Sequence, residues 1–278
     1  MNLKIITTFG LGETKIGTAA KSLVSMNIAQ GSVIDFSLSS INITNNVTSK
    51  EDSSLRVGAI VNAANQRCLG GGGVDGAINN AGGPNLWKDR EALPLLSKDG
   101  TTRCHTGGAV VTGPGRYGNL RVNYVVHAVG PAYFAFSKNS EGDDSDENDS
   151  CDNSDVDPSV EFAKPDALLR SAYHESLERC REKGITDVAF SLLSAGIFRG
   201  RRSLNDVLEI GVIAIRDWFS EQESTNSNST GDDDGEDRLQ ASPHRLKSVT
   251  LVGYSKIEVN ALAKVCQNVF ENNDLERN

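Results

Sequence analysis

The sequence predicts one layered α/β domain built on a mixed or parallel sheet. From residue 56 onward, short apolar runs typical of buried strands alternate with amphipathic stretches typical of helices. The chain has 278 residues, of which 38% are apolar, so it can form a core of ordinary size. Two strongly acidic tracts fall between the predicted elements, which indicates insertions into one domain and not a boundary between two.

The N-terminal part of the chain is the least regular. Residues 3–9 favour a short strand, and residues 14–29 favour a helix that packs at the sheet edge. Residues 32–43 alternate apolar and polar side chains, which predicts a half-buried strand. The continuous apolar run at 56–64 predicts a central strand that is buried on both faces.

The elements after that strand alternate regularly. Residues 74–82 and 84–96 follow a run of glycines and favour two short helices, the second with Pro84 in its first turn. Further strands are predicted over residues 108–113, 123–130, 186–194 and 246–254, and further helices over 165–184, 203–219 and 255–272.

Two of these helices carry marked ends. We expect the helix over 165–184 to begin after Pro165 and to end at Gly184. The helix over 203–219 has Ser203 at its start and Asp206 three residues later, which predicts a capping box.

The formal net charge of −9 conceals a basic folded part. Residues 140–157 carry nine acidic and no basic residues, and residues 220–237 carry seven acidic and no basic residues. Such tracts bury too little apolar surface to fold, so we expect residues 137–164 and 220–243 to be disordered insertions. The rest of the chain has 21 acidic residues against all 28 lysines and arginines, a balance that suits an anionic ligand.

The number and spacing of the cysteines indicate which metal or disulfide chemistry is expected and in which cellular compartment the protein works. The five cysteines are scattered and form no C-x-x-C pair, which argues against a disulfide framework and a zinc site. We therefore expect a reducing compartment, cytoplasmic or nuclear, and neither a metal nor a cofactor. No apolar run approaches the length of a membrane span, and the N-terminus lacks the apolar region of a signal peptide, so we expect no membrane partner.

Residues 70–73 are four consecutive glycines, and residues 71–76 match G-x-G-x-x-G by letter. A dinucleotide-binding fingerprint needs its first glycine at the strand end and an acidic residue about 20 residues on, at the end of a second strand. Here the eight residues from Ala63 to Gly70 separate the apolar core of the strand from Gly71, and the region beyond is predicted to be helical. We therefore interpret the run as a wide loop that leads to a helix start, whose backbone N–H groups can face a phosphate.

A second stretch of the same kind lies at residues 191–203. It contains the end of a strand, a glycine-containing turn and a helix start, and it also carries three arginines. If this strand lies beside residues 56–62, the two loops flank one crevice at the carboxyl ends of the strands, where ligands bind in α/β folds. Two facing loops suit a diphosphate better than a single phosphate. Arg201 and Arg202 are equally well explained as part of a solvated basic turn.

Three segments of the chain resemble the core motifs of macrodomains in order and spacing. They read AIVNAANQRCLGGGGVDGAINNAGG, TGGAVVTGPGRYGNLRVNYVVHAVGP and LLSAGIFRG, and they are most similar to the MacroD-type branch that hydrolyses ADP-ribose adducts. The resemblance covers residues 56–134 and 165–272. It implies a three-layer α/β/α domain with a central mixed, largely parallel sheet. Such a domain binds ADP-ribose with the adenine near the first strand and the diphosphate between the two glycine loops.

The resemblance also implies site residues. Asn65 matches the asparagine that contacts the distal ribose, and Asp75, ten residues on, matches the carboxylate at the catalytic end. Phe198 matches an aromatic residue that packs against the distal ribose. Asn65 and Asp75 are therefore the implied catalytic residues, and the implied ligand-binding residues are Asn42, Ala64, Gly71, Gly72, Gly73, Val74, Ser194, Ala195, Gly196, Ile197, Phe198 and Arg199.

Three positions depart from the family pattern. Asn42 stands where the family has an adenine-binding aspartate, unless residues 29–32 align there instead and leave Ser32 at that position. Asn79 stands where the hydrolases have histidine, and Arg199 where the family has a small glycine. Arg199 could bind a phosphate or partly close the cleft.

Several of these residues also suit plainer roles. An aspartate at a helix start, such as Asp75, is a good cap, and Asn65 suits a turn. Phe198 suits a hydrophobic core. His127 alternates with apolar neighbours, which favours a hydrogen-bonded strand histidine over a catalytic base, and His105 suits a loop.

The implied activity is hydrolysis at the distal ribose of mono-ADP-ribose adducts, either ADP-ribosylated acidic side chains or O-acetyl-ADP-ribose. Asp75 would orient the ribose and a water, and Asn65 would fix the ribose hydroxyls. Two alternatives stay open, namely a reader that binds ADP-ribose without catalysis and an ADP-ribose 1″-phosphate phosphatase. The expected partners are ADP-ribose and mono-ADP-ribosylated proteins or O-acetyl-ADP-ribose, and we expect a monomer that does not bind nucleic acid.

Overall fold

The computed structural model describes residues 3–15, 21–41, 56–96, 100–136, 158–227 and 246–271. Asn42 and most of the two acidic tracts lie outside the described residues, and what the sequence predicts for them stays a prediction.

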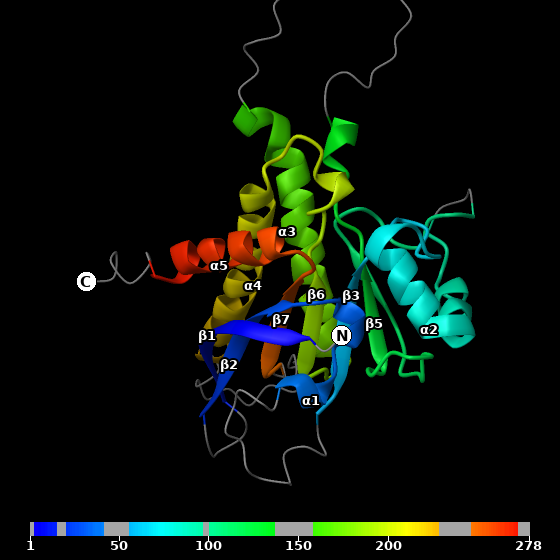
Figure 1. Ribbon diagram of the computed structural model, residues 1–278, viewed down its shortest axis with the longest axis horizontal. Helices are drawn as coiled ribbons and strands as arrows, with labels where there is room; N and C mark the ends of the chain where they lie inside the picture. The colour runs from blue at the N-terminus through cyan, green and yellow to red at the C-terminus, as the bar shows by residue number, and fades with distance from the viewer. Residues whose placement is uncertain are drawn as a thin grey trace, which may run out of the picture.

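A seven-stranded mixed sheet forms the centre of the molecule (Figure 1). Its spatial order is β1-β2-β7-β6-β3-β5-β4, with parallel pairing from β2 to β5 and an antiparallel strand at each edge. The strands are β1 (Lys4–Lys15), β2 (Lys21–Gln30), β3 (Gly58–Ala63), β4 (Ala109–Thr112), β5 (Tyr124–Ala128), β6 (Asp187–Ser191) and β7 (Ser248–Gly253). The five strands predicted after residue 55 are all present.

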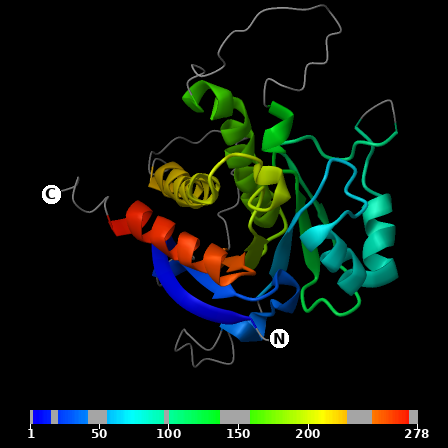
Figure 2. The same cartoon turned by 45° about the horizontal axis from the view of Figure 1, so that its top comes forward.

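Helices cover both faces of this sheet. Helices α3, α4 and α5 gather on one face and α2 lies on the other (Figure 2). Their bounds are α2 (Gly73–Glu91), α3 (Pro158–Glu182), α4 (Leu204–Ser227) and α5 (Lys256–Glu271), with a four-residue helix α1 (Leu38–Ile41). The three-layer α/β/α fold with a largely parallel sheet is therefore confirmed.

The two faces bury different side chains of the same strands, because successive strand residues point to opposite sides. On β3, Val61 packs in the larger core below α3, α4 and α5, whereas Ile60 packs against α2. On β6, Phe190 and Ala189 divide in the same way. This is why continuous apolar runs in the sequence correspond to strands buried on both sides.

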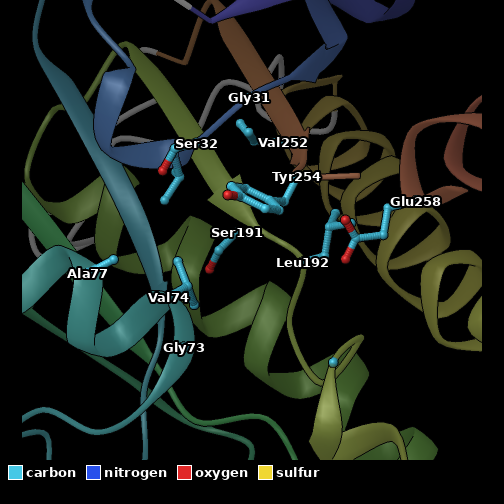
Figure 3. A pocket seen from close by; sticks show the side chains of 12 residues that line it. Gly31, Ser32, Gly73, Val74, Ala77, Ser191, Leu192, Val252, Tyr254 and Glu258 are labelled. Atoms are coloured by element: carbon cyan, nitrogen blue, oxygen red, sulfur yellow. The ribbon is translucent and has the colours of Figure 1, made fainter. Parts of the chain in front are cut away.

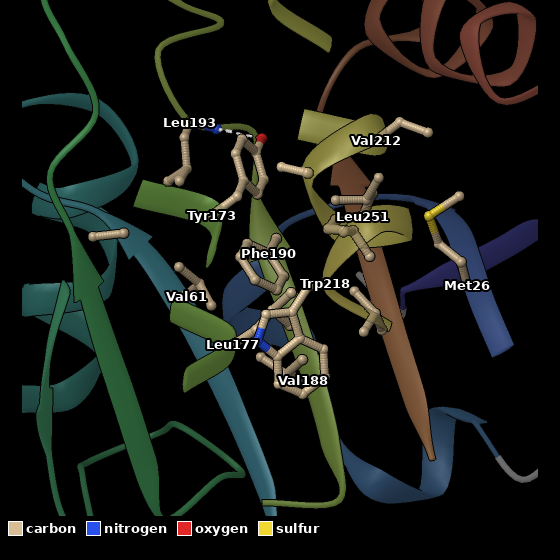
Figure 4. Packing of buried hydrophobic residues seen from close by; sticks show 14 of the residues in the cluster. Met26, Val61, Tyr173, Leu177, Val188, Phe190, Leu193, Val212, Trp218 and Leu251 are labelled. Atoms are coloured by element: carbon tan, nitrogen blue, oxygen red, sulfur yellow. Dashed lines mark hydrogen bonds between the residues drawn. The ribbon is translucent and has the colours of Figure 1, made fainter. Parts of the chain in front are cut away.

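The larger core centres on aromatic side chains (Figure 4). The rings of Tyr173 and Phe190 stack with centroids 5.4 Å apart, and Trp218 is fully buried. The polar atoms of these side chains are also bonded. Trp218 Nε1 donates to Glu178 Oε1 at 2.6 Å, and the Leu193 N–H donates to Tyr173 Oη at 3.2 Å. The second bond ties the loop after β6 to α3.

The helix predicted for residues 14–29 is wrong, because this stretch forms the end of β1 and most of β2, apart from residues 16–20, which lie outside the described residues. The short strand predicted for residues 3–9 is confirmed as part of β1 at the sheet edge. Strand β2 lies between β1 and β7, so both of its edges are hydrogen-bonded, and Val24, Met26 and Ile28, which share one face, are all buried in the larger core. Tertiary pairing overrides a local helical pattern here.

The strand predicted for residues 32–43 is also wrong. The chain leaves the sheet at Gly31, which has a φ of 145°, and forms a 3₁₀ turn at Val33–Asp35 followed by α1. Val33 and Phe36, three residues apart, are the buried apolar side chains in the described part of this segment. Their spacing matches one helical turn, whereas the alternation of Ile34 and Phe36 that predicted a strand does not correspond to one buried face.

The two helices predicted after the glycine run are confirmed as two segments of α2 that meet at a kink. Gly83 sits at the kink with φ 63° and ψ −160°, and Pro84 begins the second segment. That segment ends at Glu91, earlier than predicted.

Helices α3 and α4 extend beyond their predicted bounds. Helix α3 begins at Pro158, so Pro165 lies inside it instead of starting it, and α4 continues to Ser227. A proline removes one backbone donor, which a long helix can tolerate. Residues 158–164 and 220–227 are thus helical, while the other residues of the predicted insertions lie outside the described residues. The Asp206 N–H donates to Ser203 Oγ at 3.1 Å, which is the predicted cap of α4.

Candidate ligand-binding site

A cavity of about 450 Å³ opens at the carboxyl ends of the central parallel strands (Figure 3). The register places these ends together, because Gln30 of β2 pairs with Gly253 of β7, and Val252 of β7 pairs with Ser191 of β6. Polar and glycine residues that follow strands therefore converge on one space.

Five segments line the cavity. Gly31, Ser32 and Val33 follow β2, Gly73, Val74 and Ala77 begin α2, Ser191 and Leu192 end β6, Gly196 lies in the second loop, and Val252, Tyr254 and Glu258 come from β7 and α5. In Figure 3, Val74 and Ala77 approach from the α2 side and Leu192 and Glu258 from the opposite side. The glycine run and the second loop therefore flank one crevice, as the sequence predicted.

Glu258 is both a wall of the cavity and the cap of α5. Its Oε2 accepts from the Ser255 N–H at 2.7 Å and lies 3.0 Å from Ser255 Oγ, while the Glu258 N–H donates to Ser255 Oγ at 3.2 Å. This reciprocal pair is a capping box that the sequence analysis did not identify.

The first loop is held in shape by Asn65. Its Nδ2 donates to the Gly70 carbonyl at 2.9 Å, and its Oδ1 accepts from the Arg67 N–H at 3.0 Å. The Ala64 N–H bonds the Ala128 carbonyl at 2.9 Å, which anchors the loop to β5. Asn65 thus closes the turn before the glycines, and its side chain remains half-buried.

Asp75, in the first turn of α2, is buried with 3% of its surface exposed. Its Oδ1 accepts from Arg90 Nη2 at 2.7 Å and from Asn62 Nδ2 at 2.8 Å. Its Oδ2 is also buried and has no hydrogen-bond partner among the described residues. A buried carboxylate oxygen without a partner is costly, which makes it a candidate for binding a ligand.

The contacts of Asp75 continue into the sheet. Asn62 Nδ2 also lies 3.2 Å from His127 Nδ1, and His127 Nε2 lies 3.0 Å from Thr112 Oγ1. Because Asn62 donates, His127 accepts at Nδ1 and carries its proton on Nε2, which it donates to Thr112. Burial, reinforced by the positive charge of Arg90, holds the pKa of His127 well below its usual range. The predicted strand histidine, hydrogen-bonded and neutral, is confirmed.

Gly71 lies directly against the Asn65 and Asp75 side chains. A Cβ placed on Gly71 would be 3.1 Å from Asn65 Nδ2 and 3.2 Å from Asp75 Oδ2. A Cβ on Gly72 or Gly73 would meet no atom within 4 Å. Gly71 therefore covers the two implied catalytic side chains, while a side chain at Gly72 or Gly73 would point into open space.

The second loop leaves β6 in a strained conformation. Ser194 has a φ of 54°, and its Oγ donates to the Pro131 carbonyl at 2.8 Å, which fixes the loop against residues 130–131. Ser194 and Ala195 are buried, and Gly196 is exposed. The chain therefore turns outward at Gly196, at the edge of the cavity.

Beyond Gly196 the loop presents apolar side chains to solvent. Ile197 is 87% exposed, and Phe198 is 37% exposed and meets Phe134 edge to face, with ring centroids 6.1 Å apart. The core reading of Phe198 is therefore wrong. Arg199 Nη1 donates to the Arg202 carbonyl at 2.8 Å, which turns this guanidinium group toward its own loop.

Metal and membrane chemistry gain no support from the part of the chain that the structure describes. It contains no cluster of three or more His, Cys, Asp or Glu residues that could hold a metal ion. Among its helices, none has both the length and the apolar character needed to cross a bilayer.

Similarity to known proteins decides the family. A family model described as Macro domain matches residues 61–147 and 156–206. An O-acetyl-ADP-ribose deacetylase of Escherichia fergusonii is 34% identical to this chain over 166 residues, which are 60% of this chain and 75% of that protein. This chain belongs to the macro domain family.

Further relatives agree with this assignment. A macro domain-containing protein of Caldanaerobacter subterraneus is 39% identical over 142 residues, 51% of this chain and 63% of that protein. The match therefore spans less than two thirds of that relative. The solved Oceanobacillus iheyensis macrodomain with ADP has a TM-score of 0.56 and 19% identity, and covers 96% of this chain and 100% of its own. That likeness shows the shared fold.

The macro domain cavity contains only some of the residues implied by the resemblance. Gly73, Val74 and Gly196 line it. Asn65, Asp75 and Gly71 form a separate cluster beside it, below the first loop. The implied residues Ala64, Gly72, Ser194, Ala195, Ile197, Phe198 and Arg199 belong to the two loops but are not among the residues that line the cavity.

At the other end of the macro domain cavity, Ser32 is a lining residue, whereas Asn42 lies outside the described residues. The alternative alignment of residues 29–32 therefore fits the position of the cavity.

Sequence reasoning missed Tyr254 and Arg90. Tyr254 directly follows β7 and lines the cavity with 80% of its surface exposed, so its position at the end of the strand predicted over residues 246–254 was an available signal. Arg90 lies among charged residues late in α2, yet it is 0% exposed. No local pattern marks it, because its partner Asp75 is a full helix segment away.

Proposed function

We propose that this macro domain binds ADP-ribose in the cavity and hydrolyses mono-ADP-ribose adducts at the distal ribose, with O-acetyl-ADP-ribose as one substrate. One observation carries this proposal. The buried Asp75 carboxylate has one oxygen fixed by Arg90 and Asn62 and a second oxygen with no partner among the described residues, next to the Asn65 amide. The name of the Escherichia fergusonii relative supports the substrate class.

The residues that line the cavity suit two parts of ADP-ribose, the adenine base and the diphosphate. Tyr254 offers an exposed aromatic face on which a base can stack, worth roughly 1–3 kcal/mol in nucleotide binding. The start of α2 at Gly73 and the turn at Gly196 both line the cavity. Backbone N–H groups at a helix start bind phosphate without a cationic side chain, so these two segments suit the diphosphate.

The proposed chemistry uses the free oxygen of Asp75. For an ADP-ribosylated acidic side chain, the carboxylate leaves the anomeric carbon with the bonding electron pair, and the positive charge that builds on the sugar ring is stabilised by a carboxylate at fixed distance. Asp75 Oδ2 would orient the attacking water, and Asn65 would orient the ribose hydroxyls. Such positioning lowers the barrier without any change in the charge of the protein.

Access to Asp75 requires a displacement of Gly71. Gly71 covers Oδ2, but its neighbours Gly72 and Gly73 have no side chains and no close contacts at their Cβ positions. The loop can therefore shift without breaking side-chain packing. We propose that the distal ribose displaces Gly71 when ADP-ribose binds, and that this brings the ribose to Asn65 and Asp75.

The same burial favours a second candidate, a reader that binds ADP-ribose without turnover. With 3% of its surface exposed and an ion pair to Arg90, Asp75 has the features of a structural carboxylate. If the loop does not move, the cavity can still hold the nucleotide and the diphosphate.

Calorimetry with ADP-ribose, together with release assays, separates the candidates. The substrates are a protein mono-ADP-ribosylated on acidic side chains, O-acetyl-ADP-ribose and ADP-ribose 1″-phosphate. We expect binding, and release from the first two substrates that Asp75→Asn lowers by roughly 10²-fold or more with little loss of affinity. Binding without release would leave the reader, release from the 1″-phosphate alone would indicate a phosphatase, and an Asp75→Asn variant with full activity would disprove the role of Asp75.

A further inference from the structure

Arg90 is a fully buried cation in a helix whose neighbouring charges are at the surface. It lies late in α2, where Lys88 and Glu91 are exposed, yet 0% of Arg90 is accessible to solvent. Removing a guanidinium group from water costs roughly several kcal/mol unless hydrogen bonds and an opposite charge compensate the lost hydration. Its position therefore needs an explanation in terms of what it contacts.

Each arm of the guanidinium group contacts a different part of the proposed active site. Nη2 donates to Asp75 Oδ1 at 2.7 Å, Nε donates to the Cys68 carbonyl, and Nη1 lies 3.5 Å from Asn79 Oδ1. Cys68 belongs to the loop that carries Asn65, and Asn79 belongs to the first segment of α2 with Asp75. Arg90 thus joins the glycine loop, the start of α2 and the second segment of α2.

The contact with Asp75 is selective for one oxygen. Arg90 and Asn62 both bind Oδ1, which fixes the plane of the carboxylate and directs Oδ2 toward Gly71 and Asn65. Asn62 alone would hold the carboxylate less firmly against rotation about its Cβ–Cγ bond, because a single hydrogen bond to a charged group is worth only about 1.5–3 kcal/mol.

We propose that Arg90 is a positioning residue for the hydrolysis, which acts by holding Asp75 Oδ2 toward the reacting sugar. This inference rests on the proposed function and adds a specific residue to it. Arg90 does not touch the substrate, so it affects turnover through Asp75. No contact of Arg90 described above reaches Tyr254 or the loop at Gly196, so their contacts with the ligand should be retained.

The competing explanation is that the Arg90–Asp75 pair only stabilises the fold. The chain offers a matched control in the Arg56–Asp187 pair, in which Arg56 Nε donates to Asp187 Oδ2 at 2.8 Å. Asp187 is 0% exposed, and it begins β6, at the opposite end of that strand from the cavity. Removing Arg56 therefore breaks a comparable buried pair without reaching the site.

The experiment compares Arg90→Met, Arg90→Lys, Arg56→Met, Asp75→Asn and the double variant Asp75→Asn/Arg90→Met. For each variant, kcat, the Kd for ADP-ribose and Tm are measured. We expect Arg90→Met to lower kcat by roughly 10²-fold with less than about a threefold change in Kd, since small misplacements of a catalytic group have effects of this size. Arg90→Lys should recover part of kcat, and Arg56→Met should lower Tm while kcat stays at the wild-type value.

The double variant provides the decisive readout. If Arg90 acts through Asp75, adding Arg90→Met to Asp75→Asn lowers kcat by no more than about threefold further, because the two losses are not independent. The double variant also carries no unpaired buried charge, so it serves even where Arg90→Met alone fails to fold. Multiplicative losses, or an Arg90→Met protein with wild-type kcat and a lowered Tm, would overturn the inference. An inactive wild-type protein would instead refute the proposed function.

Discussion

Gly71 packs against Asp75 so closely that a side chain there would begin 3.2 Å from Asp75 Oδ2 and 3.1 Å from Asn65 Nδ2. Gly71 has no positive φ, so its lack of a side chain matters here for the close contact with the two side chains beneath it. The next two glycines of the run, Gly72 and Gly73, have open space at the same position. The loop therefore contains Gly71, which fits over the proposed catalytic pair, and Gly73, which lines the cavity.

This difference gives a prediction about two neighbouring glycines. Gly71→Ala should lower kcat by roughly tenfold or more, because the new methyl group displaces Asn65 or Asp75 from its position. Gly72→Ala, with no atom within 4 Å of its Cβ, should change the Kd for ADP-ribose without lowering kcat. Steady-state kinetics and calorimetry on both variants test this. Equal kcat losses in the two variants would show that the loop acts as a whole.

Tyr254 should contribute to affinity and not to turnover. Replacing Tyr254 by Ala removes the exposed ring of the cavity, and we expect ADP-ribose binding to weaken by roughly 1–3 kcal/mol. Ile257→Ala is the control, since Ile257 is 75% exposed on the same helix–strand corner but does not line the cavity. Calorimetry measures both, and an unchanged Kd for Tyr254→Ala would exclude stacking on this ring.

His127 should make the fold sensitive to acid. The pKa of His127 lies well below its ordinary value because the residue is buried near Arg90, so the folded state rejects a proton that the unfolded chain binds below about pH 6.5. The contribution of His127 to stability is therefore complete above this pH and lost below it. The free energy of unfolding should fall by up to roughly 1.4 kcal/mol per pH unit on acidification.

Urea unfolding at several pH values between about pH 7.5 and about pH 5 gives the free energy of unfolding at each pH, and the slope against pH follows from these values. His127→Gln keeps an acceptor and a donor for Asn62 and Thr112, and it should show a shallower slope than the wild type. His105→Gln, at an exposed position, should keep the slope of the wild type. Parallel slopes for wild type and His127→Gln would contradict the prediction.

Ser194 should reveal the strain in the second loop. Ser194→Ala loses the hydrogen bond to the Pro131 carbonyl and keeps a φ of 54°, so we expect a loss of about 1 kcal/mol in the free energy of unfolding. Ser194→Gly loses the same bond but relieves the positive φ, and should be roughly 1 kcal/mol more stable than Ser194→Ala. Urea denaturation compares the two variants, and the reverse order would show that the backbone is not strained there.

The sequence predicted most of the architecture because the relevant signals are local. Continuous apolar runs between turn residues identified the strands from β3 onward, and their two-sided burial followed from alternating side chains. Of the N-terminal strands, β1 was predicted in part, over residues 3–9, whereas β2 was not predicted. Strand β2 owes its conformation to pairing with β1 and with β7, and β7 is distant in the sequence.

Sequence also brought the two glycine loops to one crevice, because parallel strands align their carboxyl ends. It implied Asn65 and Asp75 through a resemblance that depends on their ten-residue spacing. It did not indicate Arg90, Tyr254 or the covering position of Gly71.

What the sequence by itself determined is therefore the layered fold, the family and the two loops, all of which follow from patterns within short segments. Only the tertiary structure decided how Asp75 is used, since its partners Asn62 and Arg90 come from a strand before it and a helix segment after it. An ion pair in a buried site depends on which groups are excluded from water together, and that depends on the packing of the whole chain.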